Sequence, residues 1–478
     1  PFHLVLMFNS NSHKTMKQLS INILLCLMLL IGATSCEKFL EIPPEGEIPT
    51  EDALKTPGDV QLLLNSCYDV LRSAKFMGGK IRNLSDLMGD DRDGRSLSGN
   101  WLSYYAHNTG IFNQETRDMW SEPYIMIYRC NVLLENMDLV ADLSADQKAR
   151  TTAEAKFLRA VGHFELVRMF ANPYGFTSDN SHDGIPLRIQ ASQEALPRAT
   201  VGEVYAQILS DLEDAKDVLP ANNGGYATSW AVKAYLARVH FQMNDFQAAF
   251  DYSNEVISGG GFVLDSSVMG RFTSNINTEN IFNLISTGSL NNSGAELGGI
   301  YRSTNLSNPP SGRISNELYL TATADTNDLR GKSYYVLANA GQTNELVLLT
   351  RFNETWFNVP LLHLAEMLLI RAESAAELGN LAQAEDDVNA IRNRAGLADV
   401  TPGLDDASLK IIIRNERRLE MVGEGYRFHD LRRQGVHDSP ALLINGSPWD
   451  CNGMMVQLPD EERSGNPTIA LNPEGGCN

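Results

Sequence analysis

The sequence lacks the short motifs by which many enzymes and metal proteins are detected. It has no nucleophile elbow, no phosphate-binding loop, no HExxH zinc motif and no CxxC pair. Scattered acids in so acidic a chain do not nominate a glycosidase pair, because many pairs would fit. We therefore predict a protein that is not an enzyme, with no cofactor and no metal ligands.

Positive charge is also scarce. The chain has 39 Lys and Arg against 59 Asp and Glu, a net charge of −20. Such a chain repels nucleic acid and anionic lipid head groups. We predict no nucleic-acid partner.

No apolar run has the length of a bilayer span. The run Leu19–Ile31 has 13 residues, whereas a spanning helix needs about 20. It follows Lys17 and leads through small residues to Cys36, the order of a secretory signal. We predict a bacterial lipoprotein signal over residues 16–35, with Cys36 as the lipidation site. The alternative is an ordinary signal peptide with a chance Cys near the cut.

The chain opens with Pro1, and Met16 is a plausible native start. We expect residues 1–15 to be upstream and non-native, and exclude them from fold reasoning.

The remaining cysteines fall into two groups. Cys67 and Cys130 lie in apolar helical patterns, which indicates buried thiols. Cys451 and Cys477 lie in a loop-rich tail, where a disulfide would form only in an oxidising compartment. The sequence leaves that pairing open.

Helical spacing of apolar residues recurs along the chain. It predicts helices after Thr56-Pro57 and in three further stretches, 117–140, 151–170 and 201–219. We expect the segments 54–72 and 119–139 to pair, and likewise 151–171 and 201–219.

Two later segments, 229–257 and 360–394, share a spacing of small residues. Ala237 and Ala249 in the first correspond to Ala372 and Ala384 in the second. Small residues at that spacing, on either side of a turn, are typical of tetratricopeptide helix pairs. By contrast, residues 259–358 are rich in Gly, Ser, Asn and Thr, which favours loops with a few short strands.

The predicted fold is therefore mostly α: tetratricopeptide-like helix pairs form a scaffold with a large, irregular, loop-rich ligand face. We expect an N-terminal helical region, 36–260, and a C-terminal region, 261–478, in one packed unit.

Residues 414–433 are dense in Arg, Glu and Asp. An active site would need a poised acid and base in a cleft. We favour the alternative, an ion-pair lattice that fixes this segment to its neighbours.

Residues 88–110 carry aromatic rings among polar groups, and we predict a loop there. Flat aromatic faces suit sugar rings, and polar side chains suit hydroxyl groups. The candidate ligand-binding residues are Asn100, Trp101, Tyr104, Tyr105, Asp91 and Arg92, with Tyr301 and Trp356 as weaker candidates. The alternative is that these rings only attach the loop to the scaffold.

Five segments together resemble the SusD/RagB family of surface lipoproteins. They are KFLEIPPEG after Cys36 and residues 120–138, 153–175, 361–380 and 412–433, and the tail 457–473 is similar too. The resemblance implies a mostly helical fold and nutrient binding at the cell surface, usually of oligosaccharide. It implies an outer-membrane protein held by lipid, which closes as a lid over a SusC-like TonB-dependent transporter. The alternatives are a peptide-binding member of the family and a tetratricopeptide-type scaffold for surface proteins.

Replacing Cys36 with Ser tests the lipid anchor. We expect Cys36→Ser to release soluble protein, because the acyl chains supply about 0.8 kcal/mol of membrane affinity per buried CH₂ group. Membrane fractionation at high salt measures the release. A variant that still sediments with membranes would show that partner contacts, rather than lipid, hold the protein.

Overall fold

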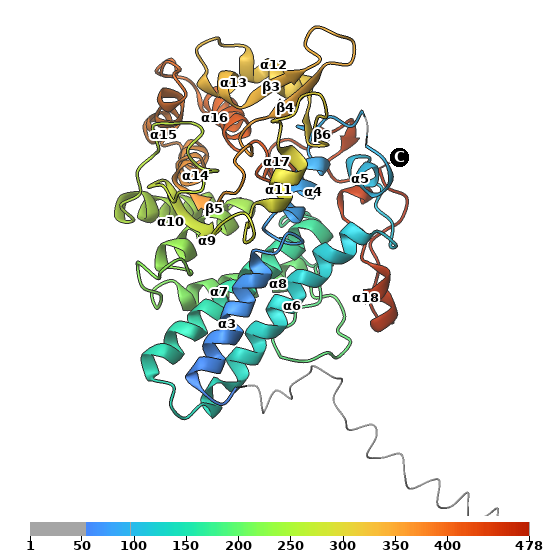
Figure 1. Ribbon diagram of the computed structural model, residues 1–478, viewed down its shortest axis with the longest axis vertical. Helices are drawn as coiled ribbons and strands as arrows, with labels where there is room; N and C mark the ends of the chain where they lie inside the picture. The colour runs from blue at the N-terminus through green and yellow to red at the C-terminus, as the bar shows by residue number, and fades with distance from the viewer. Residues whose placement is uncertain (1–53, 96, 478) are drawn as a thin grey trace, which may run out of the picture. The chain divides into compact units, whose positions relative to one another are not determined.

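The computed structural model describes residues 54–95 and 97–477 (Figure 1). The chain divides into two units, Pro1–Lys55 and Thr56–Asn478, and the second is described here. The predicted signal, Cys36 and the proline-rich stretch after it lie outside the described residues.

Helices dominate the second unit, as predicted. The α-helices are α3 Pro57–Leu71, α4 Lys80–Met88, α5 Gly99–Tyr105, α6 Gln114–Asn136, α7 Ala145–Phe170, α8 Val201–Ala215, α9 Ser229–Gln242, α10 Phe246–Gly259, α11 Ala295–Tyr301, α12 Asn316–Thr323, α13 Leu329–Ser333, α14 Leu364–Glu377, α15 Leu381–Arg394, α16 Asp406–Glu420, α17 Arg427–His437 and α18 Asp460–Gly465. Short 3₁₀ turns occupy η1 Met137–Leu139 and η2 Asn452–Met454. Among the described residues, no helix combines the length and the apolar character needed to cross a membrane.

Local sequence sets the start of several helices. Thr56, Ser144 and Thr200 each form a capping box with the residue three positions on, at the starts of α3, α7 and α8. Each box satisfies two backbone N–H groups that a helix start leaves unpaired.

The first helices pack as neighbours in the lower part of Figure 1. α3 packs on α6, α6 on α7, and α7 on α8, which confirms the two predicted pairings. A close approach marks the α6–α7 contact, because a Cβ at Gly162 would lie 2.9 Å from Cγ1 of Ile127. Cys67 and Cys130 are buried free thiols, as predicted.

The two tetratricopeptide-like pairs are α9 with α10 and α14 with α15, and each pair packs together. α10 also packs against α14, so folding brings together repeats that are far apart in sequence. Ala372 and Ala384 lie in one buried core cluster with Leu409 and Ile413 of α16. Small side chains let these helix axes approach closely.

Strands are few and short. β1 Asn280–Leu284 pairs antiparallel with β5 Val359–His363, and β4 Leu346–Leu349 lies between β2 Arg313–Ile314 and β3 Tyr335–Ala338. A third sheet among the described residues pairs β6 Leu443–Ile444 with β7 Ser447–Pro448. The few short strands predicted within residues 259–358 are β1, β2, β3 and β4.

Two predictions of loop structure were wrong in part. Residues 259–358 also contain α11, α12 and α13, of which α12 is capped by Ser315 and α13 by Asp328. The predicted loop 88–110 contains α5, a helix of seven residues. Helices this short depend on tertiary packing, and Tyr104 of α5 is fully buried.

Buried charges connect the irregular segments to the helices. The Glu420 carboxylate of α16 lies 2.5 Å from Arg271 and 2.5 Å from Arg394. The Glu424 carboxylate lies 2.8 Å from Arg351, 3.1 Å from Arg271 and 3.2 Å from His363. These groups come from α15, the end of α16 and three separate loop or strand segments.

Neighbouring cations keep both carboxylates ionised. Burial by itself would raise the pKa of Glu420, but the guanidinium groups of Arg394, Arg271 and Arg330 hold that pKa well below its usual value. Burial also opposes ionisation of Glu424, yet Arg271, His363 and Arg351 lower its pKa.

Replacing Glu420 with Gln should destabilise the fold by about 3 kcal/mol, since it leaves buried arginines without a counter-charge. Because the folded-state pKa lies below the ordinary value of 4.5, the unfolded chain takes up the proton first as the pH falls. The stability that Glu420 contributes is thus present above pH 4.5 and lost below it. Denaturant unfolding at several pH values measures both effects.

A matched control is Glu317→Gln. The Glu317 side chain is 66% exposed and pairs with Arg418, so its loss should cost less than about 1 kcal/mol. An equal cost for both variants, or no pH dependence of the difference at Glu420, would contradict a stabilising role for the buried cluster.

Candidate functional site

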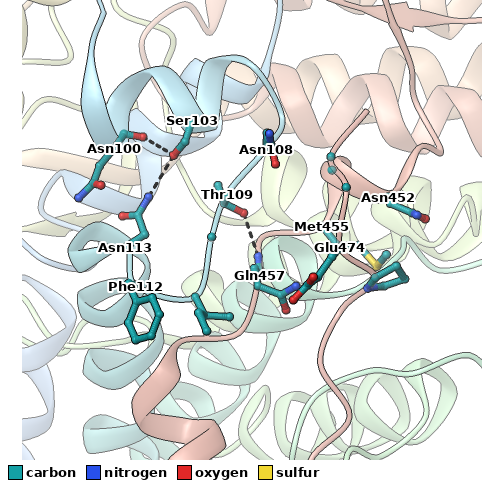
Figure 2. Close-up of a pocket in the computed structure, with 16 residues that line it drawn as sticks. Asn100, Ser103, Asn108, Thr109, Phe112, Asn113, Asn452, Met455, Gln457 and Glu474 are labelled. Carbon is teal, nitrogen blue, oxygen red and sulfur yellow. Dashed lines mark hydrogen bonds between the residues drawn. The ribbon is translucent and has the colours of Figure 1, made fainter. Parts of the chain in front are cut away.

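A pocket of about 470 Å³ lies between α5, the linker that follows it and the C-terminal tail (Figure 2). Asn100 and Ser103 of α5 and the linker 108–113 line one side. Residues 452–457 and 473–476 line the other. Segments more than 300 residues apart in sequence therefore form one cavity.

Asn113 organises the side of the pocket nearest α5. As the N-cap of α6, its Oδ1 accepts hydrogen bonds from the N–H groups of Glu115, at 2.9 Å, and Thr116, at 3.3 Å. Its Nδ2 donates to Oγ of Ser103 at 3.1 Å, and that hydroxyl donates to the carbonyl of Asn100 at 2.6 Å. α5 and the start of α6 are thereby held together (Figure 2).

The opposite side of the pocket depends on a disulfide and on glycine. Cys451 and Cys477 form a disulfide, which resolves the pairing that the sequence left open. A Cβ at Gly453 would lie 1.7 Å from the carbonyl oxygen of His107, so only glycine permits this approach. The backbone N–H of Gln457 donates to Oγ1 of Thr109 at 2.9 Å. The tail is thus fixed directly against the linker.

His107, whose carbonyl oxygen approaches Gly453, is itself held in place by contacts with the scaffold. It adopts a left-handed backbone with φ 49°, and its Nε2 lies 2.8 Å from the carbonyl oxygen of Met88. Burial lowers the pKa of His107, and Arg432 lowers it further against the opposing effect of the hydrogen bond to Met88. A neutral imidazole here adds no charge to the pocket.

Amide and hydroxyl groups line the pocket, and an exposed aromatic ring lies at its side. Its lining includes Asn100, Asn108, Thr109 and Asn452, while Phe112 is 72% exposed. Amides donate and accept hydrogen bonds equally, and a ring supplies a flat apolar face. Glu474 is the one charged residue in the lining. This chemistry suits a neutral ligand rich in hydroxyl or amide groups.

Four of the residues predicted to bind ligand are buried parts of the scaffold. Tyr104 is fully buried, and its hydroxyl lies 2.6 Å from that of Thr116. Burial raises the pKa of Tyr104 far above its usual value, so the phenol stays neutral. This ring stabilises α5 from inside and is not part of the pocket lining.

Arg92, Asp91 and Tyr301 are buried in the same way. Arg92 donates to the Tyr301 hydroxyl at 2.8 Å, and Asp91 accepts from Arg418 at 2.6 Å. Their side chains already bond within the protein, which favours structural roles for these three residues. Next to them, burial raises the pKa of Asp86 to about 7, against the opposing charge of Arg92.

The other predicted residues are partly exposed. Asn100 lines the pocket, whereas Trp101 and Tyr105 lie four residues apart on another side of α5. Trp356 lies in the loop before β5, and among the described residues no ring contact links it to Trp101. The structure therefore joins only Asn100 to the pocket.

The sequence analysis named no residue of the linker 108–113 and none of the tail segments 452–457 and 473–476 as a candidate for ligand binding. Available signals were the polar run Asn108-Thr109-Gly110 and the two tail cysteines, whose pairing would have placed residues 452–457 near 473–476.

The prediction of an ion-pair lattice in residues 414–433 is confirmed. Glu416 pairs with Arg330 at 2.6 Å and with Arg392 at 2.5 Å, and Arg417 pairs with Asp430 at 2.8 Å. All of these groups except the half-buried Arg392 are buried, which favours the structural interpretation over an open active site.

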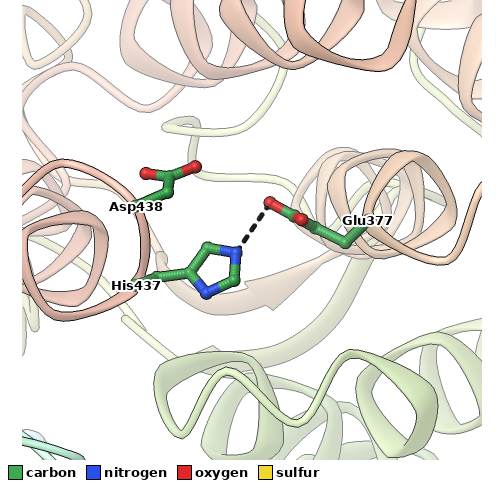
Figure 3. Close-up of side chains that lie close together, drawn as sticks. All are labelled: Glu377, His437 and Asp438. Atoms are coloured by element: carbon green, nitrogen blue, oxygen red, sulfur yellow. Dashed lines mark ion pairs between the residues drawn. The ribbon is translucent and has the colours of Figure 1, made fainter.

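Glu377, His437 and Asp438 form a small cluster of possible metal donors (Figure 3). His437 Nε2 lies 3.1 Å from Glu377. Lys410 lies 3.1 Å from Glu377, and Arg414 lies 2.8 Å from Asp438. Protein cations already neutralise these carboxylates, so the donor set fits an ion-pair cluster better than a metal site.

Comparison with known proteins agrees with this architecture. A family profile described as starch-binding and associating with the outer membrane matches residues 38–241, and a profile described as the SusD family matches residues 290–464. SusD-like protein P38 of Formosa agariphila is 26% identical over 505 residues, covering 91% of this chain and 95% of that protein.

Solved structures share the fold over most of its length. A SusD superfamily protein of Bacteroides vulgatus has a TM-score of 0.76 at 23% identity, covering 88% of this chain and 99% of that one. A laminarin-binding SusD-like protein has a TM-score of 0.69 at 22% identity, covering 88% and 100%. With family profiles matched in both halves and the fold shared, this chain belongs to the SusD/RagB family.

Proposed function

We propose that the chain binds oligosaccharide at the surface formed by α5, its linker and the C-terminal tail. The observation that carries the proposal is the amide-lined pocket of about 470 Å³ with the exposed ring of Phe112 at its side. One matching family profile is described as starch-binding, and one structural neighbour binds laminarin, which supports a glycan ligand.

Trp101 and Tyr105 extend this surface on the adjacent side of α5, and Trp356 is a more distant candidate. Stacking one ring on a sugar buries about 50 Å² and contributes roughly 1 kcal/mol. A few such contacts, with hydrogen bonds from Asn100 and its neighbours, give micromolar to millimolar affinity. That range suits a protein that captures a ligand and then releases it.

The protein then delivers its ligand to a SusC-like TonB-dependent transporter, with lipid on Cys36 holding it at the outer membrane. Support for this step comes from family membership and from the lipoprotein signal in the sequence. The profile matched by residues 38–241 describes proteins that associate with the outer membrane.

Replacing Trp101 with Ala should weaken oligosaccharide binding roughly fivefold, because it removes about 1 kcal/mol of stacking. Calorimetry with starch-derived and laminarin-derived oligosaccharides measures the affinity. Trp230→Ala is the matched control, since Trp230 is also partly exposed but lies on α9, outside the pocket lining. Equal affinities for the two variants would remove Trp101 from the site.

Peptides should be titrated in the same calorimetric experiment, because the side-chain amides of the pocket can also form hydrogen bonds with a peptide backbone. Binding of peptides with no binding of any saccharide would overturn the glycan proposal.

If the protein delivers its ligand to a transporter, the two proteins should form a stable complex. Affinity purification from detergent-solubilised outer membranes of the native host should recover a TonB-dependent barrel, identified by mass spectrometry. Cys36→Ser should still bind that barrel in detergent, because the proposed contacts involve the folded body. Recovery of other surface proteins without any barrel would favour the scaffold alternative.

A further inference from the structure

A second cavity, of about 410 Å³, lies away from α5, between α3, the turn 224–226 and the end of β1. Its volume is within the range of about 300–1,000 Å³ typical of small-molecule sites. None of its lining residues is shared with the first pocket.

Two tyrosines form the aromatic part of this cavity. The rings of Tyr68 and Tyr226 lie 4.9 Å apart at an interplanar angle of 69°. Tyr68 is fixed, because its hydroxyl donates to Glu154 at 2.6 Å and accepts from the N–H of Ala227 at 3.0 Å. The Tyr226 hydroxyl donates to Oδ1 of Asn65 at 2.9 Å. Both rings remain partly exposed and are held in place before any ligand arrives.

Asn283 supplies an unused hydrogen-bonding group. Its side chain lines the cavity and is only 8% exposed, yet its Oδ1 has no hydrogen-bond partner among the described residues. Buried polar atoms without partners are rare and unfavourable. The oxygen lies beneath the cavity wall, so a ligand hydroxyl would donate to it once the amide turns toward the cavity.

The cavity lining carries one negatively and one positively charged side chain. Asp69 and Arg72 are the charged residues of its lining, and they pair with each other at 2.9 Å. Arg72 also donates to Oδ1 of Asn291. A site with one carboxylate and one guanidinium in mutual contact favours a neutral ligand over a free anion or cation.

The geometry points to a second carbohydrate site here, and we propose that the cavity binds a neutral saccharide. Tyr226 would stack on the sugar, Asn283 would accept from a hydroxyl, and Asp69 and Arg72 would bond hydroxyls at the rim. The proposal rests on saccharide binding as the function of the chain but concerns a different surface. Two sites on one body would hold a long glycan at two points and raise its apparent affinity by avidity.

Methyl NMR separates the two sites. Ile285 lines the second cavity and Ile111 lines the first pocket, so their δ1-methyl resonances report the two sites independently. The purified chain, with labelled isoleucine methyl groups, is titrated with maltoheptaose and with laminarihexaose. We expect at least one of these probes to shift the Ile285 methyl in a saturable way.

Two variants test the assignment. Tyr226→Ala should weaken the response at Ile285 roughly fivefold or more and leave Ile111 unchanged. Asn283→Leu keeps the branching at Cγ, enlarges the side chain slightly and removes the unpaired oxygen, so binding at Ile285 should fall while the melting temperature stays equal or rises. A purely structural role for Asn283 would lower the melting temperature instead.

Tyr174→Ala is the matched control, since Tyr174 is a partly exposed member of another tyrosine pair, with Tyr205 at 5.1 Å, outside both pocket linings. It should leave the Ile285 response unchanged.

The possible failures can be told apart. If saccharides shift Ile111 or bind in calorimetry while Ile285 never responds, the second site is wrong and the proposed function stands. If no saccharide binds anywhere, the proposed function fails and this proposal fails with it. A response at Ile285 to peptides alone would overturn the saccharide assignment of this cavity.

Discussion

The buried ion cluster around Glu420 and Glu424 is the interaction on which the arrangement of the chain depends. Arginines from two separate loops and from α15 converge on two carboxylates that lie four residues apart. Each buried charge is unfavourable unless all its partners are in place, so the cluster forms only when the irregular segment 260–358 docks correctly on the helices. The cluster therefore favours one arrangement of these loops. Hydrophobic burial alone would define that arrangement less well.

The helical body carries two cavities that are lined in part by irregular backbone. The first pocket depends on contacts that only glycine allows, such as Gly453 against the carbonyl of His107, and on the disulfide Cys451–Cys477 that closes the tail. The second cavity uses a turn with two glycines in left-handed conformation, Gly224 and Gly225, beside α3. In both places the backbone leaves room for a ligand, while neighbouring side chains are held by hydrogen bonds to the scaffold.

Periodicity and residue chemistry predicted much of the fold. Apolar spacing indicated the helices that pack as α3 with α6 and α7 with α8, and the alanine spacing indicated the two tetratricopeptide-like pairs. The density of Arg and Glu in residues 414–433 indicated the ion-pair lattice. These predictions succeeded because each was drawn from a local pattern of residues, and helix geometry decides which side chains of such a pattern share a face.

The candidate site was predicted less well, for the opposite reason. Tyr104 and Arg92 looked available for a ligand, but contacts with Thr116 and with Tyr301, 209 residues away, bury them. The linker and the tail form a pocket only because residues near 110 lie beside residues near 455 and 475 in the folded chain. By itself the sequence determined the helical scaffold and its internal pairings. Tertiary structure alone decided which polar and aromatic side chains are exposed and which are buried, because exposure depends on segments that meet only after folding.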